Sequence, residues 1–159
     1  MEPITIADIA LRLTGALLVG IVLGIERSVA HKNAGMRTYG LVSMGSCLFV
    51  VISLYVLPQF SGFYSIDPFR LAAGVVTGIG FLGAGLIFQK DNTLSGLTTA
   101  AGLWVACGTG IAMGFGLYEI AVIAVLLALV TFTILWFIEK AVVSIGDKTK
   151  RTIIHSKEE

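Results

Sequence analysis

Residues 120–138, IAVIAVLLALVTFTILWFI, are the stretch that decides the fold of this chain. The stretch has no charged residue, and at 1.5 Å per residue a helix of this length crosses a hydrocarbon core about 30 Å thick. Four more apolar stretches precede it, at about 9–25, 39–57, 71–88 and 97–115. The sequence therefore predicts an all-α fold, a polytopic membrane bundle of five transmembrane helices.

The composition supports a single membrane domain. Hydrophobic residues make up 56% of the chain and charged residues only 13%, and the mean hydropathy is +0.92, so little remains for a separate water-soluble core. The runs are about twice as long as barrel strands and lack their alternation. We expect a transmembrane domain over residues 1–140 and a short basic tail over residues 141–159. The start, with Glu2 and Asp8, does not resemble a cleaved signal peptide, so we expect the first helix to be retained.

Lysine and arginine predict the orientation, because short basic loops stay in the cytoplasm. Only Arg12 and Arg70 fall on the side of the N-terminus, which we therefore expect to lie outside, with the C-terminus cytoplasmic. The net charge of +1 gives no argument for nucleic-acid binding. The tail can lie against anionic lipid or remain solvated. The other nine of the eleven cationic residues are Arg27, Lys32, Arg37, Lys90, Lys140, Lys148, Lys150, Arg151 and Lys157.

Cysteine and histidine do not suggest a metal site. Cys47 and Cys107 fall in the middle of apolar spans, where a thiol behaves as a small hydrophobic group. His31 and His155 lie far apart in polar segments, without the spacing of metal ligands. We expect no metal and no cofactor.

Glycine is concentrated on the first, third and fourth spans. Small residues at four-residue spacing let helix backbones approach closely in lipid, so we expect these three spans to form the tight centre of the bundle and the fifth, which lacks glycine, to be peripheral. The same faces are candidates for contact with a second copy. The proposed packing residues are Gly20, Gly24, Gly74, Gly78, Gly80, Gly83, Gly85, Gly102, Gly110 and Gly114.

The segment GIGFLG at residues 78–83 matches the glycine pattern of dinucleotide-binding loops. That motif requires a preceding strand and a following helix in a βαβ unit, which an apolar span does not provide. Close helix packing and a local break in the helix both remain open as explanations of these glycines.

Two polar groups at the ends of the spans are candidate sites, because polar side chains near lipid need partners or water. On the outer side we expect Asp8 and Arg12 to pair. Asp67 either caps the third span or acts in function, and Arg70 stays near the surface. On the inner side we expect Glu26 to form a bidentate pair with Arg37. A solvated loop would also explain these charges. The inner-side group is Glu26, Arg27, Arg37, Thr38, Thr98 and Thr99.

Three blocks of sequence carry a family resemblance. They are Gly20-xxx-Gly24-x-Glu26-Arg27 with AGMRTYGLV at residues 34–42, Asp67-Pro68-x-Arg70 with VTGIGFLGAG at residues 76–85, and GLTTAA at residues 96–101 followed by Trp104. Together and in this order they resemble the MgtC/SapB family of bacterial inner-membrane proteins.

The resemblance implies a multi-pass protein of the bacterial inner membrane, linked to growth in low magnesium, to survival inside host phagocytes and to control of membrane ATPases. It also implies a soluble C-terminal domain in longer members, whose function we expect to be missing here. We expect a non-enzymatic regulator that acts on a membrane ATPase or another membrane protein and forms a homo-oligomer. A transporter or channel is the alternative. An enzyme is disfavoured because the sequence offers no plausible nucleophile and base pair.

Overall fold

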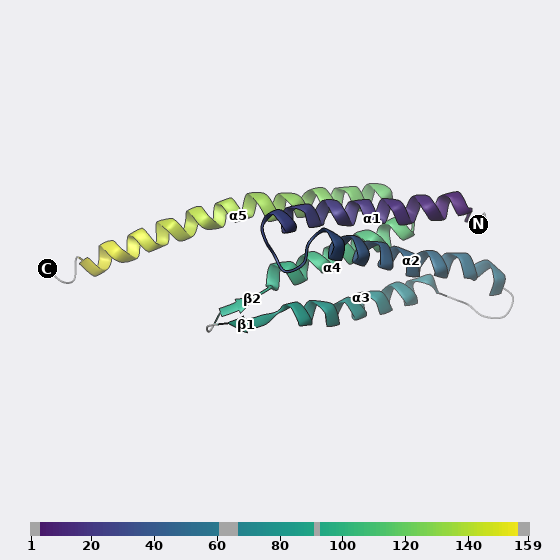
Figure 1. Ribbon diagram of the computed structural model, residues 1–159, viewed down its shortest axis with the longest axis horizontal. Coiled ribbons are helices and arrows are strands. Elements are labelled where there is room, and N and C mark those ends of the chain that lie inside the picture. Colours follow the sequence, from purple (N-terminus) through teal and green to yellow (C-terminus); the bar gives the residue numbers. More distant parts are fainter. Residues whose placement is uncertain (1–3, 61–66, 91–92, 156–159) are drawn as a thin grey trace.

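Five helices lie side by side and alternate in direction along the chain (Figure 1). The computed structural model describes residues 4–60, 67–90 and 93–155. Each of the five has a segment long and apolar enough to cross a membrane, which confirms the prediction of a multi-pass membrane protein. The helices are α1 (Ile6–Val29), α2 (Met36–Phe60), α3 (Pro68–Leu86), α4 (Leu97–Gly114) and α5 (Tyr118–His155).

Local sequence signals determine where α1 and α3 begin. The Thr5 side chain accepts a hydrogen bond from the Asp8 backbone N–H at 3.2 Å, and the Asp8 carboxylate accepts from the Thr5 backbone N–H in return, which forms a capping box. At α3 the Asp67 side chain accepts from the Phe69 N–H at 2.9 Å, and Pro68 occupies the first helical position. Asp67 is therefore a helix cap, one of the two roles proposed for it.

A short hairpin that the sequence did not predict joins α3 to α4. Strand β1 (Phe88–Lys90) pairs antiparallel with β2 (Thr93–Ser95), with Phe88 opposite Ser95. The third predicted span therefore ends early, at Leu86. Gly96 follows β2 with φ of 90°, and a Cβ atom there would collide with the Leu86 carbonyl. Only glycine fits this close, left-handed turn into α4.

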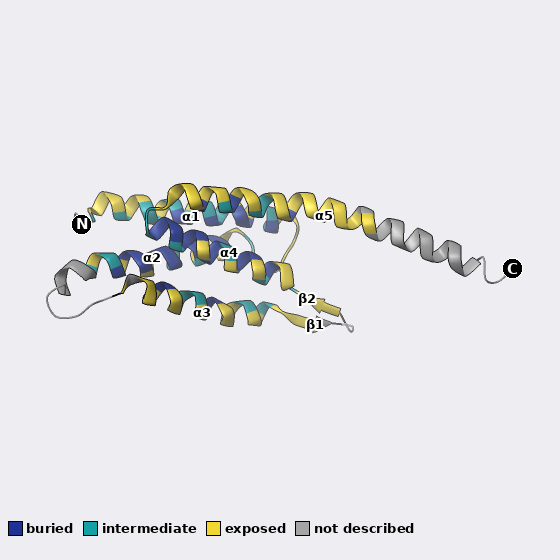
Figure 2. Cartoon of the chain, turned by 180° about the vertical axis from the view of Figure 1, so that it is seen from behind, coloured by how far each residue is buried: buried dark blue, intermediate teal, exposed yellow. Residues whose placement is uncertain are grey.

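The tight centre of the bundle consists of α1, α2 and α4, not of α1, α3 and α4 as expected. Figure 2 shows buried residues recurring along the described part of α2 and along α4, whereas α3 is mostly exposed. A Cβ atom at Gly20 of α1 would lie 2.5 Å from the Tyr39 carbonyl oxygen, and one at Gly114 of α4 would lie 2.6 Å from Val50 Cβ. The glycine faces of α1 and α4 are thus in contact with α2. Gly24 and Gly110 also approach the α2 backbone, and Gly102 approaches the Tyr39 side chain.

The glycines of α3 are largely open. A Cβ atom at Gly83 would meet the Ala100 side chain at an ordinary 3.7 Å, and the described residues place no atom within 4 Å of a Cβ at the other four positions. Close packing against the described residues therefore does not explain them. The helix continues through the GIGFLG segment to Leu86, so the structure contains no break there. The four open positions are Gly74, Gly78, Gly80 and Gly85.

Helix α5 is peripheral, as expected, and most of its span is exposed. Its helical backbone continues to His155, well past the predicted end at Ile138. The region we expected to be a tail is therefore largely helical. No proline interrupts residues 118–155, and helix-favouring lysines and an arginine follow Ile138.

The bundle has two ends, which we call the basic end and the opposite end. The basic end contains the α1–α2 turn at residues 30–35, the hairpin, and Trp136 to Lys140 of α5. The opposite end contains the starts of α1 and α3 and the turn from α4 to α5. The assignment of the basic end to the cytoplasm stays a prediction from the Lys and Arg asymmetry.

Candidate functional site

Four of the six inner-side residues, Glu26, Arg27, Thr98 and Thr99, line an open recess of about 1380 Å³ at the basic end, and Arg37 and Thr38 do not. The end of α1, the α1–α2 turn, the start of α4 and the middle of α5 form its walls. Its lining includes Glu26, Arg27, Lys32, Thr98 and Lys140. Cations outnumber anions in this lining, and the N-terminus of α4 adds the positive end of a helix dipole. The recess therefore favours anionic groups.

Arg27 is the charged side chain at the floor of the recess. Its side chain is 4% exposed and forms an ion pair with Glu26, the residue before it. The guanidinium carbon also lies 3.9 Å from the centre of the Phe132 ring of α5. A buried cation with both a carboxylate and an aromatic partner is compensated, so Arg27 joins α1 to α5.

The predicted pair of Glu26 with Arg37 is wrong. Glu26 is paired with Arg27, and the exposed side chain of Arg37 has no ion-pair partner among the described residues. Successive helical residues differ by about 100° in direction. Because Tyr39 points into the bundle, Arg37 points away from it. Thr38 is exposed as well.

Tyr39 is a site residue that sequence reasoning missed. It is fully buried, and its hydroxyl donates to the backbone carbonyl of Thr99 at 3.2 Å. Gly102 leaves room for this ring, since a Cβ there would collide with the Tyr39 hydroxyl. Thr99 is buried beside it, whereas Thr98 is exposed to the recess. A tyrosine at the start of an apolar span was the available signal, because a buried hydroxyl requires a partner.

The outer-side residues do not form one cluster. Arg12 donates from Nη1 to the Gly114 carbonyl oxygen at 2.6 Å instead of pairing with Asp8. The last carbonyls of a helix lack partners within it and carry partial negative charge, so Arg12 caps α4. Asp8 is used in the α1 capping box. Asp67 caps α3, and Arg70 is exposed on the same helix.

The fold and these sites define a multi-pass α-helical membrane protein with an open recess that contains charged residues at one end. A model of the MgtC family matches residues 13–141. The chain belongs to the MgtC family.

Several curated relatives are similar over most of the chain. Protein SapB of Bacillus subtilis (strain 168) is 39% identical over 137 residues, which cover 84% of this chain and 59% of SapB. Protein MgtC of Brucella abortus (strain 2308) is 42% identical over 119 residues, 75% of this chain and 48% of that protein. The "Putative magnesium transporter YhiD" of Escherichia coli (strain K12) is 38% identical over 118 residues, 73% of this chain and 55% of YhiD.

The chain thus spans about half the length of the curated relatives it matches. The name of YhiD states an activity, whereas the names of SapB and MgtC state none. No solved structure matches the chain significantly.

Proposed function

We propose that this chain is a non-enzymatic membrane regulator that binds another integral membrane protein through the recess at the basic end. The recess is wide, has charged and hydroxyl side chains among apolar ones, and is lined by more cations than anions. It suits an acidic segment of a partner at the membrane surface better than a small apolar ligand. The resemblance to the MgtC/SapB family suggests a membrane ATPase as the partner and growth in low magnesium as the setting.

The closed floor of the recess is the observation that carries this proposal. Below Arg27 and Phe132 lies a cluster of buried side chains that includes Leu23, Tyr39 and Leu103, each no more than 1% exposed. The glycine contacts of α1 and α4 with α2 leave no room for added atoms there. A recess that opens to one side and ends on a packed core suits a docking site better than a conduction path.

Copurification tests the proposal directly. The full chain is solubilised in mild detergent from cells grown in low magnesium, and proteins that copurify are compared between wild type and Lys32→Gln, which removes an exposed cation of the recess lining. We expect a membrane protein to copurify with wild type and to be reduced at least about fivefold with Lys32→Gln, because a surface cation near the membrane contributes about 1 kcal/mol. Arg37→Gln is the control, because Arg37 is an exposed cation at the same end outside the recess lining. Equal recovery of the same proteins with wild type and Lys32→Gln would contradict the proposal.

A transporter is the second candidate, and three buried polar atoms favour it. Arg12 Nε and the hydroxyls of Ser43 and Ser53 are buried without a hydrogen-bond partner in the described residues. Such atoms need water or an ion, and the relative YhiD carries the name "Putative magnesium transporter". Liposomes that contain only this protein distinguish the two functions. We expect no saturable Mg²⁺ uptake, and robust uptake that Ser43→Ala abolishes would favour the transporter.

A further inference from the structure

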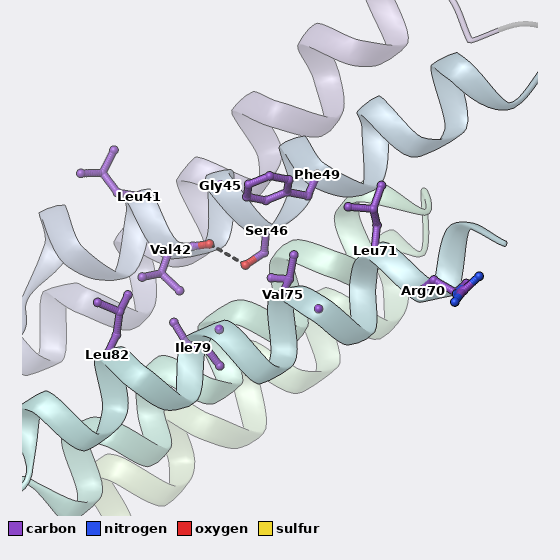
Figure 3. Close-up of a pocket in the computed structure, with 12 residues that line it drawn as sticks. Leu41, Val42, Gly45, Ser46, Phe49, Arg70, Leu71, Val75, Ile79 and Leu82 are labelled. Atoms are coloured by element: carbon purple, nitrogen blue, oxygen red, sulfur yellow. Dashed lines mark hydrogen bonds between the residues drawn. The ribbon is translucent and has the colours of Figure 1, made fainter. Parts of the chain in front are cut away.

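A long apolar groove between α2 and α3 is separate from the recess. Its volume is about 700 Å³, within the range of ligand-binding cavities. Leu41, Val42 and Phe49 of α2 line one wall, and Val75 and Ile79 of α3 line the other (Figure 3). The groove exists because α3 packs against α2 less closely than α1 and α4 do.

The walls of the groove offer hydrocarbon and almost no polar atoms. Ser46 is the hydroxyl residue of the lining, and its Oγ donates to the Val42 carbonyl at 2.8 Å, so its hydrogen bond is made within α2 (Figure 3). Gly74 and Gly78 deepen the α3 wall because they carry no side chain. An occupant must therefore be apolar along most of its length.

One cation lies at the end of the groove toward the start of α3. Arg70 belongs to the lining, and Figure 3 shows it at one end, with Leu82 near the other. The side chain is exposed, and within the described residues its guanidinium has no hydrogen bond or ion pair. Because Arg70 is the third residue of α3, it lies at the depth of lipid headgroups when α3 crosses the bilayer.

The length of the groove matches one leaflet. Arg70 and Leu82 are twelve residues apart, which corresponds to about 18 Å along a helix. Half of a hydrocarbon core is about 15 Å thick. A molecule with an anionic head at Arg70 and an apolar chain that reaches Leu82 has the dimensions and charge distribution of a phospholipid.

We propose that the α2–α3 groove is a binding site for one anionic phospholipid, with an acyl chain between the two helices and the phosphate at Arg70. This proposal does not depend on the function of the recess. The guanidinium recognises the phosphate by charge-assisted hydrogen bonds. A helix of another protein would have to supply an anion at the depth of Arg70. A second copy of this chain is the other possible occupant, and the test below distinguishes it from a lipid.

Native mass spectrometry of the full chain tests the headgroup contact. The protein is purified in mild detergent and titrated with phosphatidylglycerol or with phosphatidylcholine of the same acyl composition. We expect wild type to retain one phosphatidylglycerol in preference to phosphatidylcholine. Arg70→Gln should lower retention of phosphatidylglycerol roughly fivefold, whereas Arg70→Lys, which keeps the charge, should retain most of the preference. Arg37→Gln, which removes an exposed cation at the basic end outside the recess lining, is the control.

Two matched glycines on α3 test the acyl-chain contact. Gly78 lines the groove and Gly80 does not, yet neither has an atom within 4 Å of an added Cβ in the described residues. Gly78→Leu should reduce retention of both lipids, and Gly80→Leu should leave it unchanged. Gly74→Leu is a second variant that fills the groove.

Three results would overturn the proposal. They are an unchanged headgroup preference in Arg70→Gln, equal lipid retention in Gly78→Leu and Gly80→Leu, or a loss of oligomeric mass in Gly78→Leu without loss of lipid. The last result would assign the groove to a second copy. If the leucine variants do not fold, the comparison of Arg70→Gln with Arg70→Lys still decides the headgroup claim.

Discussion

Gly110 of α4 lies directly against the backbone of Ser43 in α2, so closely that a Cβ atom at position 110 would collide with the Ser43 carbonyl. Gly110→Leu would force α2 and α4 apart, and we expect it to destabilise the protein by about 3 kcal/mol. Gly108→Leu is a matched control, since an added Cβ at this exposed position meets no described atom within 4 Å. Thermal unfolding in detergent measures both, and equal midpoints would refute the close contact.

The hydrogen bond from Tyr39 to Thr99 gives a second prediction. Tyr39→Phe keeps the ring but leaves the buried Thr99 carbonyl without this donor, so we expect a loss of about 1 kcal/mol in stability. Tyr55→Phe, at a half-exposed position of the same helix, is the control. If both variants melt at the wild-type temperature, the hydrogen bond does not stabilise the bundle.

Substitution of Glu26 should destabilise the protein more than substitution of Arg37. Glu26→Gln leaves the buried guanidinium of Arg27 without its carboxylate, and we expect a loss of about 2 kcal/mol because Glu26 itself is partly exposed. Arg37→Gln removes an exposed charge and should change stability by less than about 0.5 kcal/mol. Thermal midpoints test this order. A larger loss of stability in Arg37→Gln than in Glu26→Gln would support the Glu26–Arg37 pair, which the structure does not contain.

Single cysteines test the orientation. In a Cys47→Ala, Cys107→Ala background, Asn33→Cys at the basic end should resist a membrane-impermeant thiol reagent in intact cells, whereas Glu119→Cys at the opposite end should react. Both positions are exposed in the structure. Labelling of Asn33→Cys without labelling of Glu119→Cys would show that the topology is the reverse of the predicted one. Ser61 and Asn92, which are natural loop positions for the same experiment, lie outside the described residues.

The transmembrane helices were predictable because apolar runs of membrane-spanning length have few other uses in a protein. The sequence did not predict which of these helices pack against one another. The expected centre contained the three glycine-rich spans. Gly110 and Gly114 instead pack against Ser43 and Val50 of α2, which are residues with side chains, and Gly20 packs against Tyr39, Ser43 and Gly40 of the same helix. Small-residue spacing shows which helix faces permit close approach. It does not show which helix fills them, because that depends on the arrangement of the whole bundle.

The sequence predicted which segments meet at the candidate site, but it did not predict which residues form the ion pair. Glu26, Arg27, Thr98 and Thr99 do meet at the basic end, because antiparallel helices with short connections return their ends to one surface. The choice of Arg27 over Arg37 as the partner of Glu26 depends on the rotation of α2, which the burial of Tyr39 determines. Sequence spacing alone contained no measure of that rotation.

The core of α1, α2 and α4 has a consequence for how the protein is made. These helices are not consecutive in the chain, so the first two spans enter the membrane before the helix that completes their contacts. Until α4 inserts, Tyr39 lacks the Thr99 carbonyl and the α2 surface that receives Gly110 and Gly114 faces lipid. The nascent α1–α2 hairpin is therefore incomplete when α3 emerges from the ribosome. Closure of the core therefore waits until α4 has been synthesised and inserted.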